Sequence, residues 1–350
     1  MPKDIHKILK QYWGYSQFRP VQEDIINSSL SGKDTLALLP TGGGKSICFQ
    51  VPALAEEGCA LVISPLIALM TDQVENLKQV GINAVAINSS LNSNQKELAL
   101  HNASNGYYKF IYLSPESLQS EKLMHRLSFV KVNSLVVDEA HCISQWGYDF
   151  RPPYLEIYKL RELFPDVPFL ALTATATPKV VTDIQQKLHF REGAQVFQKS
   201  FARPELAYNV LKTDNKWGRC KELLEKVKGT ALIYLRNRKG TMEVAKWLKE
   251  TGYSADFYHA GLSLEQRQQK QKDWVENRCR VMVCTNAFGM GIDKPDVRLI
   301  IHLDLPDSLE AYFQEAGRGA RDGRKAWSFV LVGPTDVIQL RQKFLNSFPD

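Results

Sequence analysis

Two groups of residues in this chain have the types and spacing needed to bind a nucleotide and hydrolyse it. The first is the stretch "LPTGGGKS", residues 39–46, which follows an apolar run and leads into a helix-like segment. Glycines let backbone N–H groups turn towards phosphate oxygens, a lysine here reaches the outer phosphates, and a serine hydroxyl can bind Mg²⁺. The expected phosphate-binding residues are Thr41, Gly42, Gly43, Gly44, Lys45 and Ser46, and Ser46 is also an expected magnesium ligand. The strict pattern has glycine where this chain has Leu39, and the alternative is an ordinary glycine-rich turn with a surface lysine.

The second group is "DEAH", residues 138–141, at the end of the apolar run "SLVV". In open α/β folds the carboxyl ends of the strands form the edge at which ligands bind. Asp138 is expected to hold Mg²⁺, and Glu139 is expected to polarise the attacking water. Alone, the same letters could begin a helix with favourable acids. Together with Lys45, they favour a nucleotide site.

A loop rich in aromatic residues follows these acids directly. Its rings are Trp146, Tyr148, Phe150 and Tyr154. Either the rings fill a small core beneath a long loop, or they stack on nucleic-acid bases. Such stacking does not depend on the base sequence.

The elements that must position these groups are buried strands alternating with helices. Apolar runs with little polar alternation are typical of strands that are covered on both faces in a parallel sheet. The expected strands are 35–40, 60–65, 83–88, 110–115, 134–139 and 169–175, then 230–237, 254–260, 280–286, 299–306 and 327–333. Helical patterns such as 67–80, 241–250 and 264–276 lie between them. This predicts an α/β protein with two domains, residues 1–203 and 204–350, joined within 200–210, where Pro204 interrupts the pattern.

Composition fits a protein with two ordinary domains and excludes few functions. The 350 residues include 44 Lys and Arg against 38 Asp and Glu, and this slight basic excess is compatible with nucleic acid. The six cysteines form no paired C-x-x-C motifs, so we expect reduced thiols and no zinc in this chain. No apolar stretch is long enough to cross a membrane, and residues 1–15 do not resemble a signal peptide. The chain stops just after the helix-like segment 334–344, as a fragment of a longer protein could.

The order of the motifs resembles that of superfamily 2 helicases. The glycine-rich loop and "DEAH" are followed by "TAT" (173–175 and 175–177) and by "QEAGRGARDG" (314–323). Three stretches narrow the resemblance to RecQ-family DNA helicases: "GYSQFRPVQ" (14–22), "DEAHCISQWGYDFRPPY" (138–154) and "FGMGIDKPDVR" (288–298). The resemblance covers nearly the whole chain.

That resemblance implies two tandem RecA-like lobes, each a mainly parallel sheet flanked by helices, with ATP and Mg²⁺ bound in the cleft between them. It implies 3′→5′ translocation on single-stranded DNA and unwinding of tailed or forked duplexes, in DNA repair and recombination. A monomeric core is expected. Its location would be the cytoplasm, with the nucleoid, in a bacterium and the nucleus in a eukaryote.

The resemblance also assigns nucleotide-binding roles. Tyr15 and Arg19 would sandwich adenine, Gln22 would hydrogen-bond its edge, and Asp293 would touch the ribose. His141 would relay changes from the loop to the acids. From the second lobe, Gln314, Arg318 and Arg321 would face the γ-phosphate, with Arg321 as the best match for the arginine that stabilises the transition state.

The chain departs from the family near these arginines. The family usually reads Gly-Arg-Ala-Gly-Arg, whereas this chain reads "GRGAR" (317–321). If the family glycine requires a positive φ, Ala320 is expected to be strained. The alternative for this segment is a basic loop that binds DNA phosphates.

For DNA, the resemblance assigns residues at the ends of strands and in the aromatic loop. They are Ser64, Pro65, Ser114, Gln145, Trp146, Phe150, Arg151, Arg238, His259, Thr285 and Met290. Each loop alone is indistinguishable from a normal strand-to-helix turn. Asn237 replaces the family's usual serine before Arg238, and its amide is expected to bind a phosphate.

Two other functions stay open. An RNA helicase or duplex translocase of the same superfamily would use the same nucleotide chemistry, but the aromatic loop favours the RecQ family. An inactive nucleic-acid-binding scaffold would not need Lys45, Asp138, Glu139 and Arg321, all of which are present.

Overall fold

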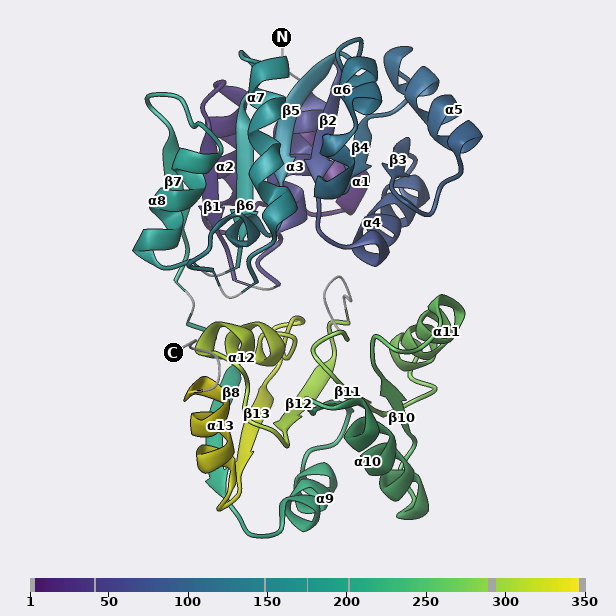
Figure 1. The fold of residues 1–350 in the computed structure, drawn as a ribbon, viewed down its shortest axis with the longest axis vertical. Helices are drawn as coiled ribbons and strands as arrows, with labels where there is room; N and C mark the ends of the chain where they lie inside the picture. The colour runs from purple at the N-terminus through teal and green to yellow at the C-terminus, as the bar shows by residue number, and fades with distance from the viewer. Residues whose placement is uncertain are drawn as a thin grey trace. The chain divides into compact units, whose positions relative to one another are not determined.

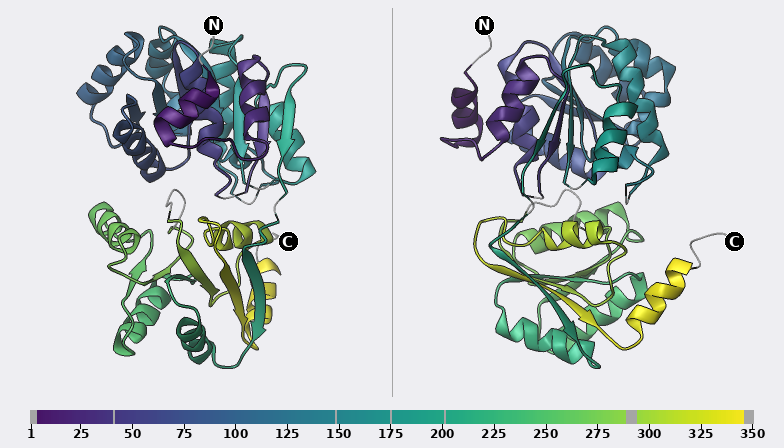
Figure 2. Two further views of the ribbon diagram at one scale, coloured as in Figure 1. Left: turned by 180° about the vertical axis from the view of Figure 1, so that it is seen from behind. Right: turned by 90° about the vertical axis from the view of Figure 1, so that its left-hand side faces the viewer.

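The computed structural model describes residues 4–40, 42–147, 149–174, 176–200, 202–288 and 294–345. The chain forms two compact units, Met1–Phe201 and Ala202–Asp350, each built on its own parallel sheet (Figures 1 and 2). The prediction of two α/β lobes, each a parallel sheet flanked by helices, is confirmed.

The sheet of the first unit has the strand order β3-β4-β2-β5-β6-β1-β7, with every pair parallel. Its strands are β1 (Thr35–Leu38), β2 (Cys59–Ile63), β3 (Ala84–Ile87), β4 (Phe110–Leu113), β5 (Val132–Val137), β6 (Phe169–Thr173) and β7 (Gln195–Gln198). Strands β1, β2, β4 and β6 are buried at every position, as their unbroken apolar runs predict.

Helices cover both faces of this sheet (Figure 2). The helices are α1 (Ile5–Trp13), α2 (Gln22–Leu30), α3 (Lys45–Ala55), α4 (Ile67–Gln79), α5 (Ser93–Ser104), α6 (Glu121–Leu127), α7 (Lys159–Leu163) and α8 (Pro178–Lys187), with 3₁₀ turns η1 (Pro115–Gln119), η2 (Ala140–Ile143) and η3 (Pro152–Tyr158). Side chains of α2, α3 and α4 pack in one core cluster with the sheet, and α5, α6, α7 and α8 contribute to another. The loops that follow the carboxyl ends of the strands lie at the edge where open α/β folds bind ligands.

The second unit repeats the plan with the strand order β10-β11-β9-β12-β13-β8. Its strands are β8 (Leu206–Lys212), β9 (Thr230–Tyr234), β10 (Ala255–Tyr258), β11 (Val281–Cys284), β12 (Val297–His302) and β13 (Ala326–Val332). Its helices are α9 (Lys216–Lys226), α10 (Arg238–Glu250), α11 (Leu264–Val275), α12 (Leu309–Ala316) and α13 (Asp336–Leu345).

Two edge strands were not predicted. In β7 only alternate residues are partly buried, and in β8 only Leu206 is fully buried, so neither forms an unbroken apolar run. The boundary between the two units, after residue 201, falls within the segment 200–210 in which the join was expected, and β8 begins inside that segment at Leu206.

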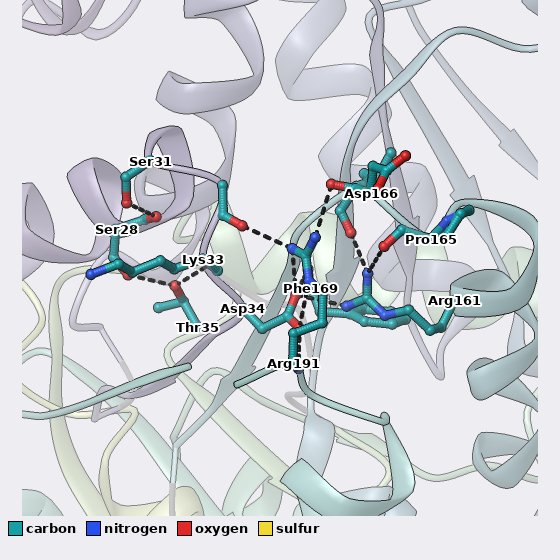
Figure 3. Close-up of polar contacts among 12 residues, drawn as sticks. Ser28, Ser31, Lys33, Asp34, Thr35, Arg161, Pro165, Asp166, Phe169 and Arg191 are labelled. Carbon is teal, nitrogen blue, oxygen red and sulfur yellow. Dashed lines mark hydrogen bonds and ion pairs between the residues drawn. The ribbon is translucent and has the colours of Figure 1, made fainter. Parts of the chain in front are cut away.

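A buried aspartate ties together the amino end of the first sheet (Figure 3). Asp34 is 1% exposed and immediately precedes β1. Its carboxylate accepts from the Phe169 amide at 2.8 Å and pairs with the guanidinium groups of Arg161 (2.7 Å) and Arg191 (3.2 Å). Burial alone would raise the pKa of Asp34, but the hydrogen bonds from Arg191 and Phe169 and the charge of Arg161 outweigh it and hold the pKa below its usual range. The aspartate thus fastens β1, β6 and the segment before β7 at the end opposite the phosphate loop.

Candidate functional site

The phosphate loop, residues 39–44, contains two glycines in a backbone conformation that favours glycine. Gly42 and Gly44 both have φ of 78°, in the left-handed region. A Cβ on Gly43 would lie 2.7 Å from the Pro40 carbonyl oxygen, and one on Gly44 would lie 2.4 Å from Gln22 Nε2. The loop passes directly into α3, so its N–H groups meet the positive end of a helix. This cradle fits phosphate groups; Thr41 lies outside the described residues.

The residues predicted to hold adenine lie against this loop. Gln22 Nε2 donates to the Gly44 and Gly43 carbonyls at 3.0 and 3.3 Å. Arg19 donates to the Gly42 carbonyl at 2.6 Å, and its own amide donates to Gln22 Oε1 at 2.8 Å. Tyr15 is 55% exposed. The structure thus brings Gln22 and Arg19 to the loop, while Asp293, the predicted ribose contact, lies outside the described residues.

The two acids and Lys45 form a second part of the same site. Lys45 Nζ lies 3.3 Å from Glu139 Oε1, and the Glu139 amide donates to Asp138 Oδ1 at 2.9 Å. Burial, together with the Glu139 charge, raises the pKa of Asp138 to about 6, while Lys45 opposes the shift. Two half-buried carboxylates beside a lysine fit a divalent cation, and Ser46, whose hydroxyl accepts from Gln73 Nε2 at 3.4 Å, is the expected further ligand.

His141 links these acids to strand β6. Its Nδ1 lies 2.9 Å from Thr173 Oγ1 and 3.4 Å from Glu139 Oε2. Burial lowers the pKa of His141, although the Glu139 charge opposes it, so the ring is neutral at physiological pH. Lys45, Glu139, His141 and Thr173 thus form one continuous set of polar contacts.

The rings that follow the acids divide into two kinds. Tyr154 is fully buried, and its hydroxyl donates to the Asp138 carbonyl at 3.0 Å. Trp146 is 63% exposed, so it does not fill a core beneath the loop. Phe150 is half-buried. Only Tyr154 fits the core-filling interpretation; Tyr148 lies outside the described residues.

The aromatic loop, residues 144–151, is also held from both sides. Arg151 pairs with Asp149 at 3.0 Å and donates to the Pro65 carbonyl at 3.2 Å. A Cβ on Gly147 would lie 2.5 Å from the His141 carbonyl oxygen, so the loop backbone packs closely on the backbone of His141. The predicted contact Gln145 is exposed beside these residues.

Two predicted DNA contacts are buried polar groups without a partner among the described residues. Ser64 Oγ follows β2 and is 1% exposed, and His259 follows β10 and is 7% exposed with both ring nitrogens unpartnered. Buried polar groups are normally hydrogen-bonded, so these two are candidates to bind a ligand.

The remaining predicted DNA contacts also lie in loops that follow strands, with different surroundings. Ser114 is half-buried after β4, and Thr285, buried after β11, accepts from the Ala287 amide at 3.4 Å. Arg238 is exposed at the start of α10. Asn237 caps that helix, because its side-chain oxygen accepts from the Gly240 amide at 2.6 Å. Met290 lies outside the described residues.

In the second unit, the predicted arginines follow α12 in a tight loop. Gln314 lies on α12, Arg318 is 8% exposed, and Arg321 is half-buried. Ala320 has φ of 58°, the left-handed conformation for which glycine is favoured. A Cβ on Gly319 would lie 2.7 Å from Ile300 Cδ1, so the glycine serves close packing and the alanine carries the backbone strain.

Arg203 was missed by the sequence analysis and holds this finger loop, residues 317–321. Its guanidinium donates to the carbonyls of Gly319 and Ala320, both at 3.1 Å. It also pairs with Glu205. No local motif could have identified this role, since the carbonyl groups that Arg203 holds lie more than a hundred residues further along the chain.

The cysteines and possible metal ligands add little to the site. All six cysteines are buried free thiols. One ligand atom each of His141, Cys142 and Asp149 lies within 4.8 Å of the others, but His141 already contacts Thr173 and Asp149 already pairs with Arg151. Within the described part of the chain, no helix is both long and apolar enough to cross a membrane.

Comparison with known proteins gives two matching family models. Residues 19–184 match the DEAD/DEAH box helicase model, and residues 215–323 match the helicase conserved C-terminal domain. Among curated proteins, the chain is 44% identical to the probable ATP-dependent DNA helicase RecS of Bacillus subtilis, over 98% of this chain and 69% of that protein. It is 40% identical to the ATP-dependent DNA helicase RecQ of Synechocystis, over 98% of this chain and 75% of that protein. It spans only 54% of the RecQ helicase of Pasteurella multocida, to which it is 40% identical over 97% of its own length.

Solved structures share the fold at low identity. Saccharomyces cerevisiae Dbp5 bound to RNA and ADP BeF3 superposes with a TM-score of 0.76 at 20% identity, covering 98% of this chain and 91% of that one. The Mycobacterium smegmatis helicase Lhr bound to single-stranded DNA and AMP-PNP gives a TM-score of 0.75 at 20% identity, covering 99% and 50%. The two units are therefore tandem RecA-like lobes, as predicted.

Proposed function

The chain belongs to the RecQ family of DNA helicases, and from this premise we propose that it is an ATP-dependent helicase core that moves 3′→5′ along single-stranded DNA and unwinds tailed or forked duplexes. One observation carries the proposal. The polar contacts that begin at Lys45 continue through Glu139 to His141, and the backbone of the aromatic loop packs on His141. A nucleotide site and an exposed ring at the surface thus share one short segment of chain.

The nucleotide chemistry follows from the side chains of the first unit. Loop N–H groups and Lys45 bind the phosphates, and Ser46 and Asp138 would hold Mg²⁺. When bound, this ion neutralises charge on the phosphate oxygens. Glu139 orients the attacking water and accepts its proton, and its contact with neutral His141 keeps the carboxylate aimed at that water. Arg321, supported by Arg318 and Gln314, stabilises the charge that develops on the transferred phosphoryl group.

Coupling to DNA passes through the aromatic loop. A base that stacks on Trp146 shifts a loop whose backbone lies against the His141 carbonyl. The shift alters how His141 holds Glu139, so hydrolysis responds to DNA. The orphaned polar groups of Ser64 and His259 bind phosphate oxygens along the strand.

An RNA substrate is the second candidate. The putative ATP-dependent RNA helicase R290 of Acanthamoeba polyphaga mimivirus is 40% identical to the chain, over 98% of this chain and 63% of R290. Stacking and phosphate contacts do not by themselves distinguish the two nucleic acids.

The deciding experiment measures unwinding of 3′-tailed DNA, 5′-tailed DNA and 3′-tailed RNA duplexes of the same sequence. ATP hydrolysis is measured in parallel with single-stranded DNA, single-stranded RNA or neither. We expect unwinding of the 3′-tailed DNA duplex alone and the strongest stimulation by single-stranded DNA. Preferred unwinding of the 5′-tailed duplex would refute the polarity, and preferred unwinding of RNA would refute the substrate.

The cellular setting follows from the same family membership. We propose roles in DNA repair and recombination, at the nucleoid in a bacterium or in the nucleus of a eukaryote. We also propose that the core is monomeric and binds no zinc.

A further inference from the structure

A lysine of helix α8 lies directly over the exposed ring of the aromatic loop. Lys179 Nζ is 3.1 Å from the centre of the Trp146 ring, and Trp146 is 63% exposed. A second lysine of the same helix, Lys187, lies 5.9 Å from the Phe150 ring and donates to the Ile143 carbonyl at 3.2 Å. Helix α8 therefore contacts the loop at both of its ends, and Lys179 occupies one face of the exposed Trp146 ring.

The position of Lys179 is electrostatically poor without an anion nearby. It lies in the first turn of α8, which begins at Pro178 after the capping residue Thr177, and that turn contains no acidic residue. A positive charge near a helix N-terminus is unfavourable. No carboxylate in the described structure pairs with Lys179. The ring face of Trp146 is thus the partner that the folded protein offers to this ammonium group.

A nucleic-acid base and the ammonium group compete for that face. A cation over an exposed aromatic ring contributes about 0.5–1 kcal/mol, whereas stacking of a base contributes roughly 1–3 kcal/mol. Stacking is the stronger interaction, so a base can displace the lysine from the ring. The lost cation–ring contact offsets only part of the stacking energy.

We propose that Lys179 is a latch: it holds Trp146 against α8 in the DNA-free protein, and the first base that stacks on Trp146 displaces it. This inference rests on the proposed function, because it requires that single-stranded DNA occupies the aromatic loop. It assigns Lys179 as a positioning residue that sets how much DNA is needed to stimulate hydrolysis.

The latch connects to the nucleotide site through the start of α8. Thr173, which contacts His141 at 2.9 Å, ends β6 only six residues before Lys179. Lys179 and Thr173 therefore lie on one short segment, and release of the aromatic loop from Lys179 takes place close to the contact between Thr173 and His141. The Trp146 ring and the His141 relay respond to one event.

The test measures the single-stranded DNA concentration that gives half-maximal ATP hydrolysis. Lys179→Ala should lower this concentration about 2–5-fold, because the competing cation–ring contact is removed. Lys179→Arg keeps a cation over the ring and should restore the parental value. Lys78→Ala, an exposed lysine on α4, is the matched control for the loss of one positive charge and should not lower the concentration.

A second background tests whether the effect passes through the ring. Binding of fluorescently labelled oligothymidine is measured by anisotropy, with Lys179→Ala introduced into the parent and into Trp146→Leu. The substitution should tighten binding in the parent and have no such effect in Trp146→Leu. Equal tightening in both backgrounds would overturn the latch, as would an unchanged or raised half-maximal concentration for Lys179→Ala. A parent protein that does not respond to DNA overturns the proposed function as well, whereas a responsive parent with an unresponsive Lys179→Ala overturns the latch alone.

Discussion

At the scale of single residues, five described non-glycine positions adopt left-handed backbone, and two of them lie at the predicted catalytic acids and arginines. Glu139 has φ of 47° and Ala320 has φ of 58°. Such a conformation costs an ordinary residue roughly 1–2 kcal/mol and persists only where its surroundings hold it. At Glu139, the contacts to Lys45, His141 and the Asp138 carboxylate supply that support.

Glu139→Gln should retain ATP binding and lose hydrolysis, because the amide fills the same space but cannot accept the water proton. Lys45→Ala should both weaken ATP binding and abolish turnover, because it removes the cation that binds the phosphates. Equilibrium binding of ATP and steady-state hydrolysis distinguish a loss of hydrolysis alone from a loss of both. Hydrolysis by Glu139→Gln at the parental rate would show that another group activates the water.

Ala320→Gly should raise the free energy of unfolding by up to about 1 kcal/mol, because glycine adopts φ of 58° without steric cost. Gly319→Ala is the matched control and should destabilise, since its Cβ would press on Ile300. Urea unfolding of both variants measures the difference. Destabilisation by Ala320→Gly would mean that the Cβ of Ala320 contributes more through packing than it costs in strain.

These residues also show what sequence can and cannot predict. Lys45, Asp138 and Glu139 lie in short patterns whose spacing carries the chemistry, so they could be predicted together. Arg203 could not, because its contact with Gly319 spans 116 residues. Lys179 could not either, since a lysine near a helix start has no pattern that points to Trp146.

At the scale of elements, buried strands could be predicted and edge strands could not. Strand β2 is apolar and buried throughout, whereas β8 has exposed residues along its length and reads as a linker. The aromatic loop shows the same limit in another form. Sequence shows that it contains rings, but burial alone separates Tyr154, which packs under the acids, from Trp146, which faces solvent.

Trp146→Ala should abolish stimulation of ATP hydrolysis by single-stranded DNA and abolish unwinding, while leaving the melting temperature unchanged. An exposed ring contributes little to stability, whereas truncating a buried tryptophan costs about 3–5 kcal/mol. Calorimetry and DNA-stimulated hydrolysis are the two measurements. Full stimulation in a stably folded variant would refute the role of the ring.

The finger loop allows a graded prediction. Arg321→Ala should lower kcat by about 10³-fold or more with little change in ATP affinity, as an arginine that acts in the transition state does. Arg203→Ala should lower kcat less, because it removes the bonds that hold the Gly319 and Ala320 carbonyls and leaves Arg321 in place. Arg318→Ala tests which arginine acts. A large loss of affinity with normal kcat in Arg321→Ala would favour the DNA-phosphate interpretation of this loop.

At the scale of the whole molecule, each unit has its own sheet and its own core clusters. In the first unit, Asp34 joins β1, β6 and the segment before β7, and its partners hold its pKa below the usual range. A carboxylate whose pKa is lower in the folded state than in the unfolded state stabilises the folded state at pH values above its unfolded pKa of about 4. This contribution to the free energy of unfolding is lost as the pH falls towards the pKa of the folded state.

Asp34→Asn should therefore destabilise the protein by about 3 kcal/mol or more at pH 7, because it leaves Arg161 buried without a counter-charge. The difference between parent and variant should be constant from pH 6 to 8 and shrink below about pH 4. Urea unfolding across this pH range measures it. A difference that stays unchanged down to pH 3 would show that the charge of Asp34 is not what stabilises the fold.

The Asp34 contacts also set an order for folding during synthesis. Its partners Arg161, Phe169 and Arg191 lie 127, 135 and 157 residues further along the chain, and β1 lies between β6 and β7, the last two strands of its unit. A ribosome releases the chain from its N-terminus, so β1 waits unpaired while most of the unit is still being made. We therefore expect the phosphate loop that follows β1 to gain its support only when the strand ending at Gln198 has emerged, and a nascent chain to bind ATP only once its first lobe is whole.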